Sequence, residues 1–171
     1  WHIYRPGRPL VDPDTGEVLG NEVVFLGEAR VVKFGEPATV EITRSVQEIN
    51  VGDSLLPAKE APVTTYAPHA PEQPIDGRII SIYGGVAEGA RNSIVTLNKG
   101  RSAGIEIGHV LALYRHGKTV ASGYEGGPEA VRLPAERYGL VFVFRTFDKV
   151  SYGLVVQSTR PVHVADDVRK P

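Results

Sequence analysis

The sequence predicts an all-β protein of two related small barrel-like or sandwich-like units, with long loops and little helix. Three observations predict this class. A strand-and-turn phrase occurs three times, at 49–55, 105–111 and 162–168. The 171 residues include 19 Gly and 13 Pro, which suits many short strands joined by turns. No segment longer than two turns shows helical periodicity.

Each copy of the phrase has β-branched or apolar residues at its first and third positions, a small residue at the fourth and an apolar residue at the seventh. This pattern predicts a strand, a tight turn and a second strand. The neighbouring segments are similar in pairs: 3–7 with 113–117, and 19–25 with 138–144. We therefore interpret 1–58 and 110–171 as two copies of one unit.

The first unit, residues 1–58, is expected to be truncated at its N-terminus, because the sequence starts in the middle of what the duplication implies is a repeat. On the same ground we expect the chain to be a fragment of a longer protein. Pro6 and Pro9 interrupt the first strand, since proline cannot donate to a ladder. Residues 12–16 have the composition of a turn. Strands are expected at 3–4, 18–19, 23–26, 29–34 and 39–43.

Residues 59–76 are predicted to be a Pro-rich linker, because they show neither the period of a strand nor that of a helix. Prolines at this spacing favour extended polyproline II geometry. A ligand for a polyproline-binding partner is an alternative reading of the same composition.

Residues 77–171 are predicted to form the second β region, which contains a repeat of the first. Its strands are expected at 78–83, 93–97, 110–114, 141–144, 153–156 and 162–164, separated by turns rich in Gly, Asn and Pro. The apolar face of each predicted strand gives the expected core of the whole chain: Val24, Val31, Val40, Ile42, Val51, Leu55, Ile80, Ile82, Val95, Leu97, Ile107, Leu111, Leu113, Val141, Val143, Val155 and Val164.

Composition narrows the function classes. The formal net charge of −1, with both signs interspersed, gives no electrostatic footprint for nucleic acid or an anionic membrane. The absence of cysteine removes disulfides, thiolate nucleophiles and Cys-rich zinc sites. No apolar run approaches the length of a membrane-spanning helix.

Two local motifs resemble binding loops without satisfying their chemistry. Residues 112–119 fit a relaxed phosphate-loop pattern, but the glycines and proline that follow exclude the helix that such a loop needs. Residues 12–17 resemble the opening of a calcium loop, but Val23 replaces the required bidentate Glu. A structural turn is the better interpretation of both.

No catalytic constellation is predicted. The five histidines, at 2, 69, 109, 116 and 163, have no metal-ligand spacing, so a metal site would need long-range convergence. Asp166 and Asp167 are adjacent and should point apart. Ser122 lies in no nucleophile elbow. The tyrosines and Trp1 offer a stacking surface for saccharides, but edges of the core are the favoured role. We predict no catalytic, cofactor-binding or metal-binding residue, and the ligand-binding residues stay unknown.

Several segments of the sequence also resemble a known protein family. The segments 3–7, 12–20, 27–29, 37–39, 52–57 and 95–104 together resemble the region that follows a LysM module in envelope proteins of Gram-negative proteobacteria. The segment 94–111 is also similar to the C-terminal β domain of flagellar assembly proteins of the T type. The resemblance implies a periplasmic or cell-envelope location and peptidoglycan as a partner, reached through a LysM module outside this chain.

We therefore expect a non-catalytic accessory or scaffold domain of a LysM-type peptidoglycan-binding envelope protein, with no cofactor and no nucleic-acid partner. Two alternatives stay open. The first is an autonomous glycan-binding or protein-interaction module. The second is a cell-wall hydrolase with a site between the two units, for which the sign would be a pocket holding two carboxylates or a histidine with a carboxylate.

Overall fold

The computed structural model describes residues 1–58, 66–84, 86–117, 119–121 and 130–171. It is an all-β structure, as predicted, and the described residues contain a single short 3-10 turn at Arg101–Ala103. The chain divides into two compact units. The first comprises 1–10 and 20–58 of the described residues, and the second comprises 11–19 and 66–171. No helix in the described residues is long and apolar enough to cross a membrane.

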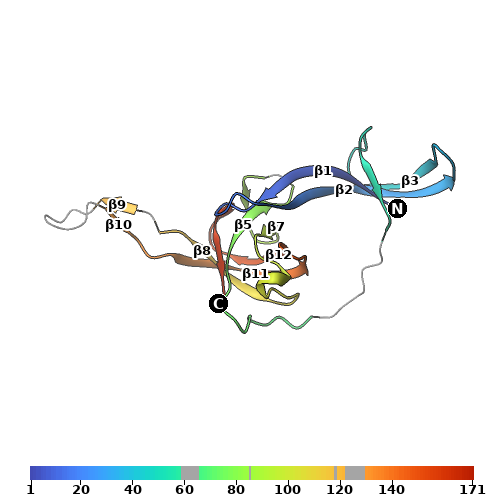
Figure 1. The fold of residues 1–171 in the computed structure, drawn as a ribbon. Coiled ribbons are helices and arrows are strands. Elements are labelled where there is room, and N and C mark those ends of the chain that lie inside the picture. The colour runs from blue at the N-terminus through green and yellow to red at the C-terminus, as the bar shows by residue number, and fades with distance from the viewer. Residues whose placement is uncertain (59–65, 85, 118, 122–129) are drawn as a thin grey trace. The chain divides into compact units, whose positions relative to one another are not determined.

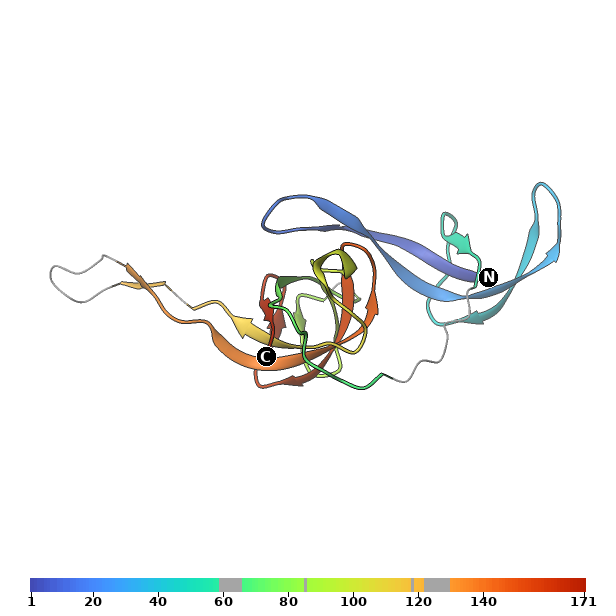
Figure 2. The same cartoon turned by 60° about the horizontal axis from the view of Figure 1, so that its bottom comes forward.

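The second unit is built on a closed barrel of six strands, which curve around a common centre in Figures 1 and 2. The strands follow the order β11-β12-β7-β5-β14-β8, and every neighbouring pair is antiparallel. Their bounds are β5 (Asp76–Ile82), β7 (Ile94–Leu97), β8 (Val110–Arg115), β11 (Glu136–Thr146), β12 (Ser151–Ser158) and β14 (Asp167–Arg169).

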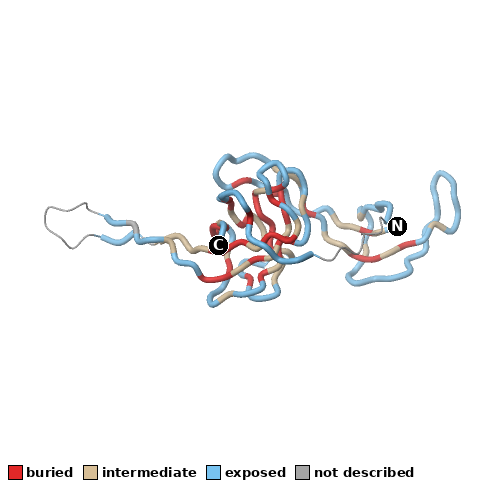
Figure 3. The backbone as a smooth tube through the Cα atoms, turned by 90° about the horizontal axis from the view of Figure 1, so that it is seen from below, coloured by how far each residue is buried: buried red, intermediate tan, exposed pale blue. Residues whose placement is uncertain are grey.

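Two short ladders accompany the barrel. β9 (Thr119–Ala121) pairs with β10 (Ala130–Arg132), and this ladder extends the hairpin of β8 and β11 away from the barrel in Figure 1. β6 (Glu88–Gly89) pairs with β13 (Val162–His163). The barrel interior holds the larger apolar core, and Figure 3 shows most of the buried backbone there.

The first unit is an open sheet of four strands in the order β3-β2-β1-β4. The strands are β1 (His2–Val11), β2 (Val18–Lys33), β3 (Thr39–Ser45) and β4 (Ser54–Leu56). Its core is small. Ile3, Leu26 and Ala29 are buried, and Val24 and Ile49 pack against them.

The duplication extends to the strand register. In the first unit Ile3 pairs with Leu55 and Tyr4 with Ser54, and in the second Leu113 pairs with Val168 and Tyr114 with Asp167. The β1–β4 ladder therefore repeats as β8–β14.

The β2–β3 ladder likewise repeats as β11–β12, irregularities included. The pairs Gly27–Ser45 and Ala29–Ile42 correspond to Gly139–Ser158 and Val141–Val155, with a register shift at the same place between them. A β-bulge shared in position is expected of two copies of one unit, because a bulge is a specific feature of a strand pair. By this register, residues 26–33 are equivalent to residues 138–145 in the repeat. The match of 19–25 with 138–144 that was expected from the sequence was wrong.

The expected core is confirmed in the barrel at eight positions: Ile82, Val95, Leu97, Leu111, Leu113, Val141, Val143 and Val155. Five others are exposed: Val40, Ile42, Val51, Leu55 and Val164. Val51 and Val164 lie in the turns of the phrase, where a side chain faces solvent. Val40, Ile42 and Leu55 belong to the first unit, whose open sheet has less to cover them. Four are partly buried: Val24, Val31, Ile80 and Ile107.

Within β5 a bulge changes which residues face inward. A register shift between Ile79 and Ser81 allows both Ile79 and Ile82 to lie in the core, although they are an odd number of residues apart. Strict alternation places Ile80 inward instead. Ile79 is fully buried, and Ile80 is only partly so.

The second half of the segment expected to be a linker is part of the second unit. Residues 59–65 lie outside the described residues, and 66–76 belong to the second unit. His69 forms a parallel bridge with His109, in which the His69 amide donates to the Gly108 carbonyl at 3.0 Å and the Val110 amide donates to the His69 carbonyl at 2.8 Å.

Candidate functional site

The three copies of the phrase form the same turn. The fourth residue has a positive φ in each: 100° at Gly52, 101° at Gly108 and 71° at Ala165. In each copy the amide of the fifth residue donates to the carbonyl of the second, at 3.2 to 3.3 Å. Such a turn needs φ above zero at its second central position, which explains the small residue there.

The side chain of the fifth residue closes the turn from the other side. Asp53 accepts a hydrogen bond from the Asn50 amide at 2.7 Å, and Asp166 accepts one from the His163 amide at 2.8 Å. In the middle copy His109 takes this role, because its Nδ1 accepts from the Glu106 amide at 3.2 Å. The polar position that varies between Asp and His therefore has one task in all three copies, that of a hydrogen-bond acceptor.

An arginine of the adjoining strand pairs with the carboxylate in the outer copies. Arg5 Nε lies 2.9 Å from Asp53 Oδ1, and Arg115 Nε lies 2.8 Å from Asp166 Oδ1. Arg5 and Arg115 are equivalent in the repeat. Asp166 also accepts a hydrogen bond from the buried Tyr138 hydroxyl at 2.6 Å. Burial, and then this hydrogen bond, raise the pKa of Tyr138 above its ordinary value.

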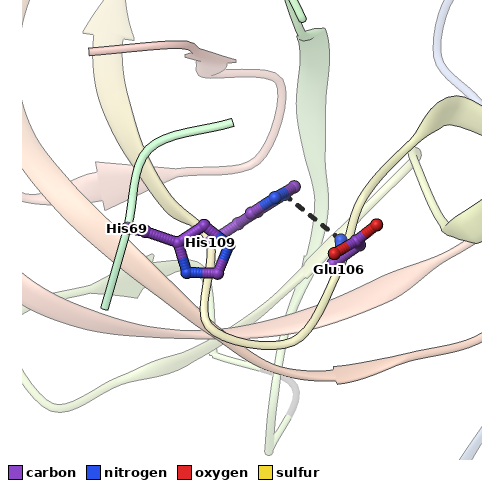
Figure 4. Close-up of side chains that lie close together, drawn as sticks. All are labelled: His69, Glu106 and His109. Atoms are coloured by element: carbon purple, nitrogen blue, oxygen red, sulfur yellow. Dashed lines mark hydrogen bonds between the residues drawn. The ribbon is translucent and has the colours of Figure 1, made fainter. Parts of the chain in front are cut away.

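The middle copy has different neighbours. His69, Glu106 and His109 converge, and their potential ligand atoms all lie within 4.8 Å of one another (Figure 4). The two imidazole rings are 4.9 Å apart between centroids and nearly perpendicular. His109 is buried, whereas His69 and Glu106 are exposed. The sequence spacing gives no sign of this cluster, because His69 comes from a distant segment.

The hydrogen bonds determine which lone pairs the cluster offers. His69 Nδ1 donates to the Ala67 carbonyl at 3.0 Å, so the lone pair of neutral His69 lies on Nε2. His109 Nδ1 accepts from the Glu106 amide, as the dashed line in Figure 4 marks, so neutral His109 carries its hydrogen on Nε2. Burial, and then the neighbouring His69, hold the pKa of His109 below its ordinary value, which favours this neutral form.

This arrangement limits what the cluster can do with a metal ion. His69 Nε2 and the Glu106 carboxylate are available as ligands, as zinc-type sites require of His and Glu. His109 becomes a third ligand only when the turn gives up its hydrogen bond to the Glu106 amide. Because the same hydrogen bond recurs in copies that have no histidine at this position, His109 has a complete structural explanation without a metal.

The second unit also contains a polar cavity of about 560 Å³. It is lined by cationic side chains (Arg78, Lys99, Arg169), by carboxylates (Asp14, Asp76, Asp167) and by His116. The carboxylates are paired. Arg78 Nε lies 2.9 Å from Asp14, Arg169 Nη2 lies 2.9 Å from Asp167, and Arg169 Nε lies 3.5 Å from Asp76.

The cavity holds a histidine beside a carboxylate, although the site expected of a hydrolase was one between the two units and this cavity lies within the second. His116 Nε2 lies 3.0 Å from the buried Asp167, and it is also 3.1 Å from Arg78 Nη1. An imidazole held by a carboxylate can act as a base when a nucleophile lies within reach. The described residues that line the cavity include no Ser, Thr or Cys.

The turn motifs singled out in the sequence have structural roles. Asp12 Oδ1 accepts from the Asp14 amide at 2.9 Å and from the Thr15 amide at 3.3 Å, so this segment is an Asx-type turn, as expected. Burial raises the pKa of Asp12, but these bonds, the amide of Asn98 and the charge of Lys99 outweigh it and leave the pKa below its ordinary value.

The phosphate-loop match and the adjacent carboxylates Asp166 and Asp167 also have structural explanations. In the phosphate-loop match at 112–119, residues 112–115 belong to β8 and Thr119 begins β9. Lys118 and Ser122 lie outside the described residues. Asp166 and Asp167 have separate partners, as expected of adjacent residues that point apart: Asp166 pairs with Arg115, and Asp167 with Arg169. Comparison with known proteins adds no assignment, since no family model and no curated protein matches this sequence.

Proposed function

We propose that this chain is a non-catalytic scaffold, an accessory β domain of a LysM-type peptidoglycan-binding protein of the cell envelope. The observation that carries the scaffold role is the use of the polar residue at the fifth position of the repeated phrase. Asp53, His109 and Asp166 close the three repeated turns. Each of these side chains accepts a hydrogen bond from the backbone of its own turn, so the fold accounts for it without a substrate.

The link to the cell wall is supported by the resemblance of the sequence to the region that follows LysM modules. On this proposal the glycan is bound by a LysM module outside the chain, in the periplasm. The test is sedimentation with insoluble, purified peptidoglycan. The chain by itself is expected to stay in the supernatant, and the same chain joined to a LysM module is expected to pellet. Pelleting of the chain alone would favour the autonomous glycan-binding module.

One observation favours a second candidate, a cell-wall hydrolase. The cavity holds His116 3.0 Å from Asp167, together with two further carboxylates. Release of soluble fragments from dye-labelled peptidoglycan measures this activity. We expect the chain to release none above the level of the buffer. Release that His116→Ala abolishes, while the exposed-pair variant Glu136→Gln retains it, would contradict the scaffold proposal.

A further inference from the structure

The first unit corresponds strand for strand to four of the six strands of the barrel. The order β3-β2-β1-β4 matches the contiguous order β12-β11-β8-β14. The register agrees on both ladders, including the shift after Gly27–Ser45 and after Gly139–Ser158. The ion pair Arg5–Asp53 recurs as Arg115–Asp166. Strand order, register and ion pair are independent features. Together they show that the first unit is equivalent to four of the six strands of the barrel.

The second unit shows what completes such a sheet. β7 pairs with β12, β5 pairs with β14, and β5 and β7 pair with each other, so this hairpin closes the barrel. In the first unit the equivalent strands β3 and β4 are the two ends of the sheet. Among the described residues, no strand pairs with the outer edge of either.

The exposed apolar residues of the first unit lie where the missing hairpin would cover them. Ile42 is 51% exposed, whereas its equivalent Val155 is fully buried. Leu55 is 39% exposed, whereas its equivalent Val168 is fully buried. Open strand edges beside exposed apolar side chains are the features by which a sheet accepts further strands.

We propose that the edges of β3 and β4 form a binding surface for a two-stranded β-hairpin that is supplied from outside residues 1–171. The hairpin resembles β5 and β7. One strand pairs along Thr39–Glu41, as β7 pairs along Tyr152–Leu154, and the other pairs along Ser54–Leu56, as β5 pairs along β14. Its inward side chains are apolar, as Ile79, Ile82, Val95 and Leu97 are in the barrel. This inference does not depend on the proposed cell-wall role.

The experiment supplies the hairpin covalently. The Ala29 amide donates to the Trp1 carbonyl at 2.8 Å, and the equivalent Val141 pairs with Leu111, so Trp1 occupies the place of Leu111. A second copy of residues 76–110 is therefore joined directly ahead of Trp1 in the full chain. Amide hydrogen exchange of β3 and β4 is measured with and without this addition. We expect exchange to slow at least tenfold in both strands, with β11 and β12 unchanged.

The matched control carries Ile79→Asp and Val95→Asp in the added copy only, which keeps its length and leaves the original barrel intact. In this control we expect β3 and β4 to exchange as they do in the unextended chain. Two results would overturn the proposal. One is unchanged exchange in β3 and β4 with the apolar hairpin attached. The other is protection of both strands in the unextended chain that rises with protein concentration and with a dimer in sedimentation, because a second copy would then be the occupant.

A second pair of variants tests the surface even if the extended protein folds poorly. Ile42→Lys and Leu55→Lys are made in the unextended chain, where both side chains are exposed. We expect the variants to fold and to bind a synthetic peptide of residues 76–97 at least tenfold more weakly than the parent chain in isothermal titration. Equal binding by parent and variants, or no binding by the parent, would contradict the proposal.

Discussion

At the scale of single residues, one position of the repeated phrase shows why a residue type can vary while its role does not. Asp53 and Asp166 carry a carboxylate and His109 carries an imidazole, but each offers an acceptor to the amide three residues before it. The sequence predicts a polar turn residue at these places, and that prediction is confirmed. It does not predict the arginine partners, because Arg5 and Arg115 are about fifty residues away along the chain.

Asp166 should be the most costly turn residue to remove. In Asp166→Ala, the Tyr138 hydroxyl and Arg115 lose a shared partner in a site where Asp166 is 3% exposed. We expect the free energy of unfolding in urea to fall by about 3 kcal/mol, because the buried Tyr138 hydroxyl loses its acceptor and Arg115, which keeps the Pro161 carbonyl, loses its counter-ion. The control is Glu136→Ala, which removes an exposed pair with Arg160 and should cost about 0–1 kcal/mol. Equal losses would show that Asp166 is not an anchor.

The raised pKa of Tyr138 predicts how the free energy of unfolding changes at alkaline pH. Its pKa in the folded chain is raised, first by burial and then by Asp166, whereas in the unfolded chain it titrates near 10. Above about pH 10 the unfolded state loses a proton that the folded state keeps, so this contribution to stability is present below that pH and falls as the pH rises. Tyr138→Phe should flatten the loss of stability between about pH 9.5 and 11, relative to the exposed control Tyr66→Phe. A slope equal to that of the control would refute this.

At the scale of elements, the repeated phrase is the part that sequence reasoning identifies best. Small residues with a periodic apolar pattern define both a turn and its flanking strands, and these are local properties. Strand irregularities are harder. The shift between Ile79 and Ser81 in β5 is determined by pairing with β7, and no local signal distinguishes Ile79 from Ile80 as the inward residue. The cluster of His69, Glu106 and His109 was missed for the same reason, since it arises from a long-range bridge.

The turn residues at the fourth position of the phrase should differ in their tolerance. A methyl group added at Gly52 would meet open space, so Gly52→Ala should cost about 1 kcal/mol through its positive φ alone. Gly108→Ala adds a contact at 3.1 Å with His69 Cε1 and should cost more. Ala165→Gly relieves the same strain and should be neutral or stabilising by up to about 1 kcal/mol. Thermal and urea unfolding of the three variants measures this order, and a destabilising Ala165→Gly would contradict it.

At the scale of the whole molecule, the two units show that one strand pattern can give different burial. The sequence identifies the inward face of the strands of the first unit, but Val40, Ile42 and Leu55 remain exposed on it. Burial depends on how many strands enclose that face, and the enclosing strands of the second unit, β5 and β7, have no counterpart among the described residues of the first. Alternation therefore predicted eight residues of the barrel core, whereas it did not predict the exposure of Val40, Ile42 and Leu55 in the open sheet.

This difference predicts unequal costs for equivalent substitutions. Val155→Ala removes methyl groups from the closed core and should lower the free energy of unfolding by about 2 kcal/mol. Ile42→Ala removes more atoms at the equivalent place but should cost under about 1 kcal/mol, because the side chain is already 51% exposed.

A pair of positions buried in both units provides the control. Ile3 and Leu113 are equivalent, at 4% and 0% exposure, so Ile3→Ala and Leu113→Ala should each cost about 2–5 kcal/mol in the unit that contains them. The measurement is urea unfolding followed by amide exchange, which assigns each loss to its unit. If Ile42→Ala proved as costly as Val155→Ala, its side chain would have to be covered in solution, and the first unit would already be a closed barrel.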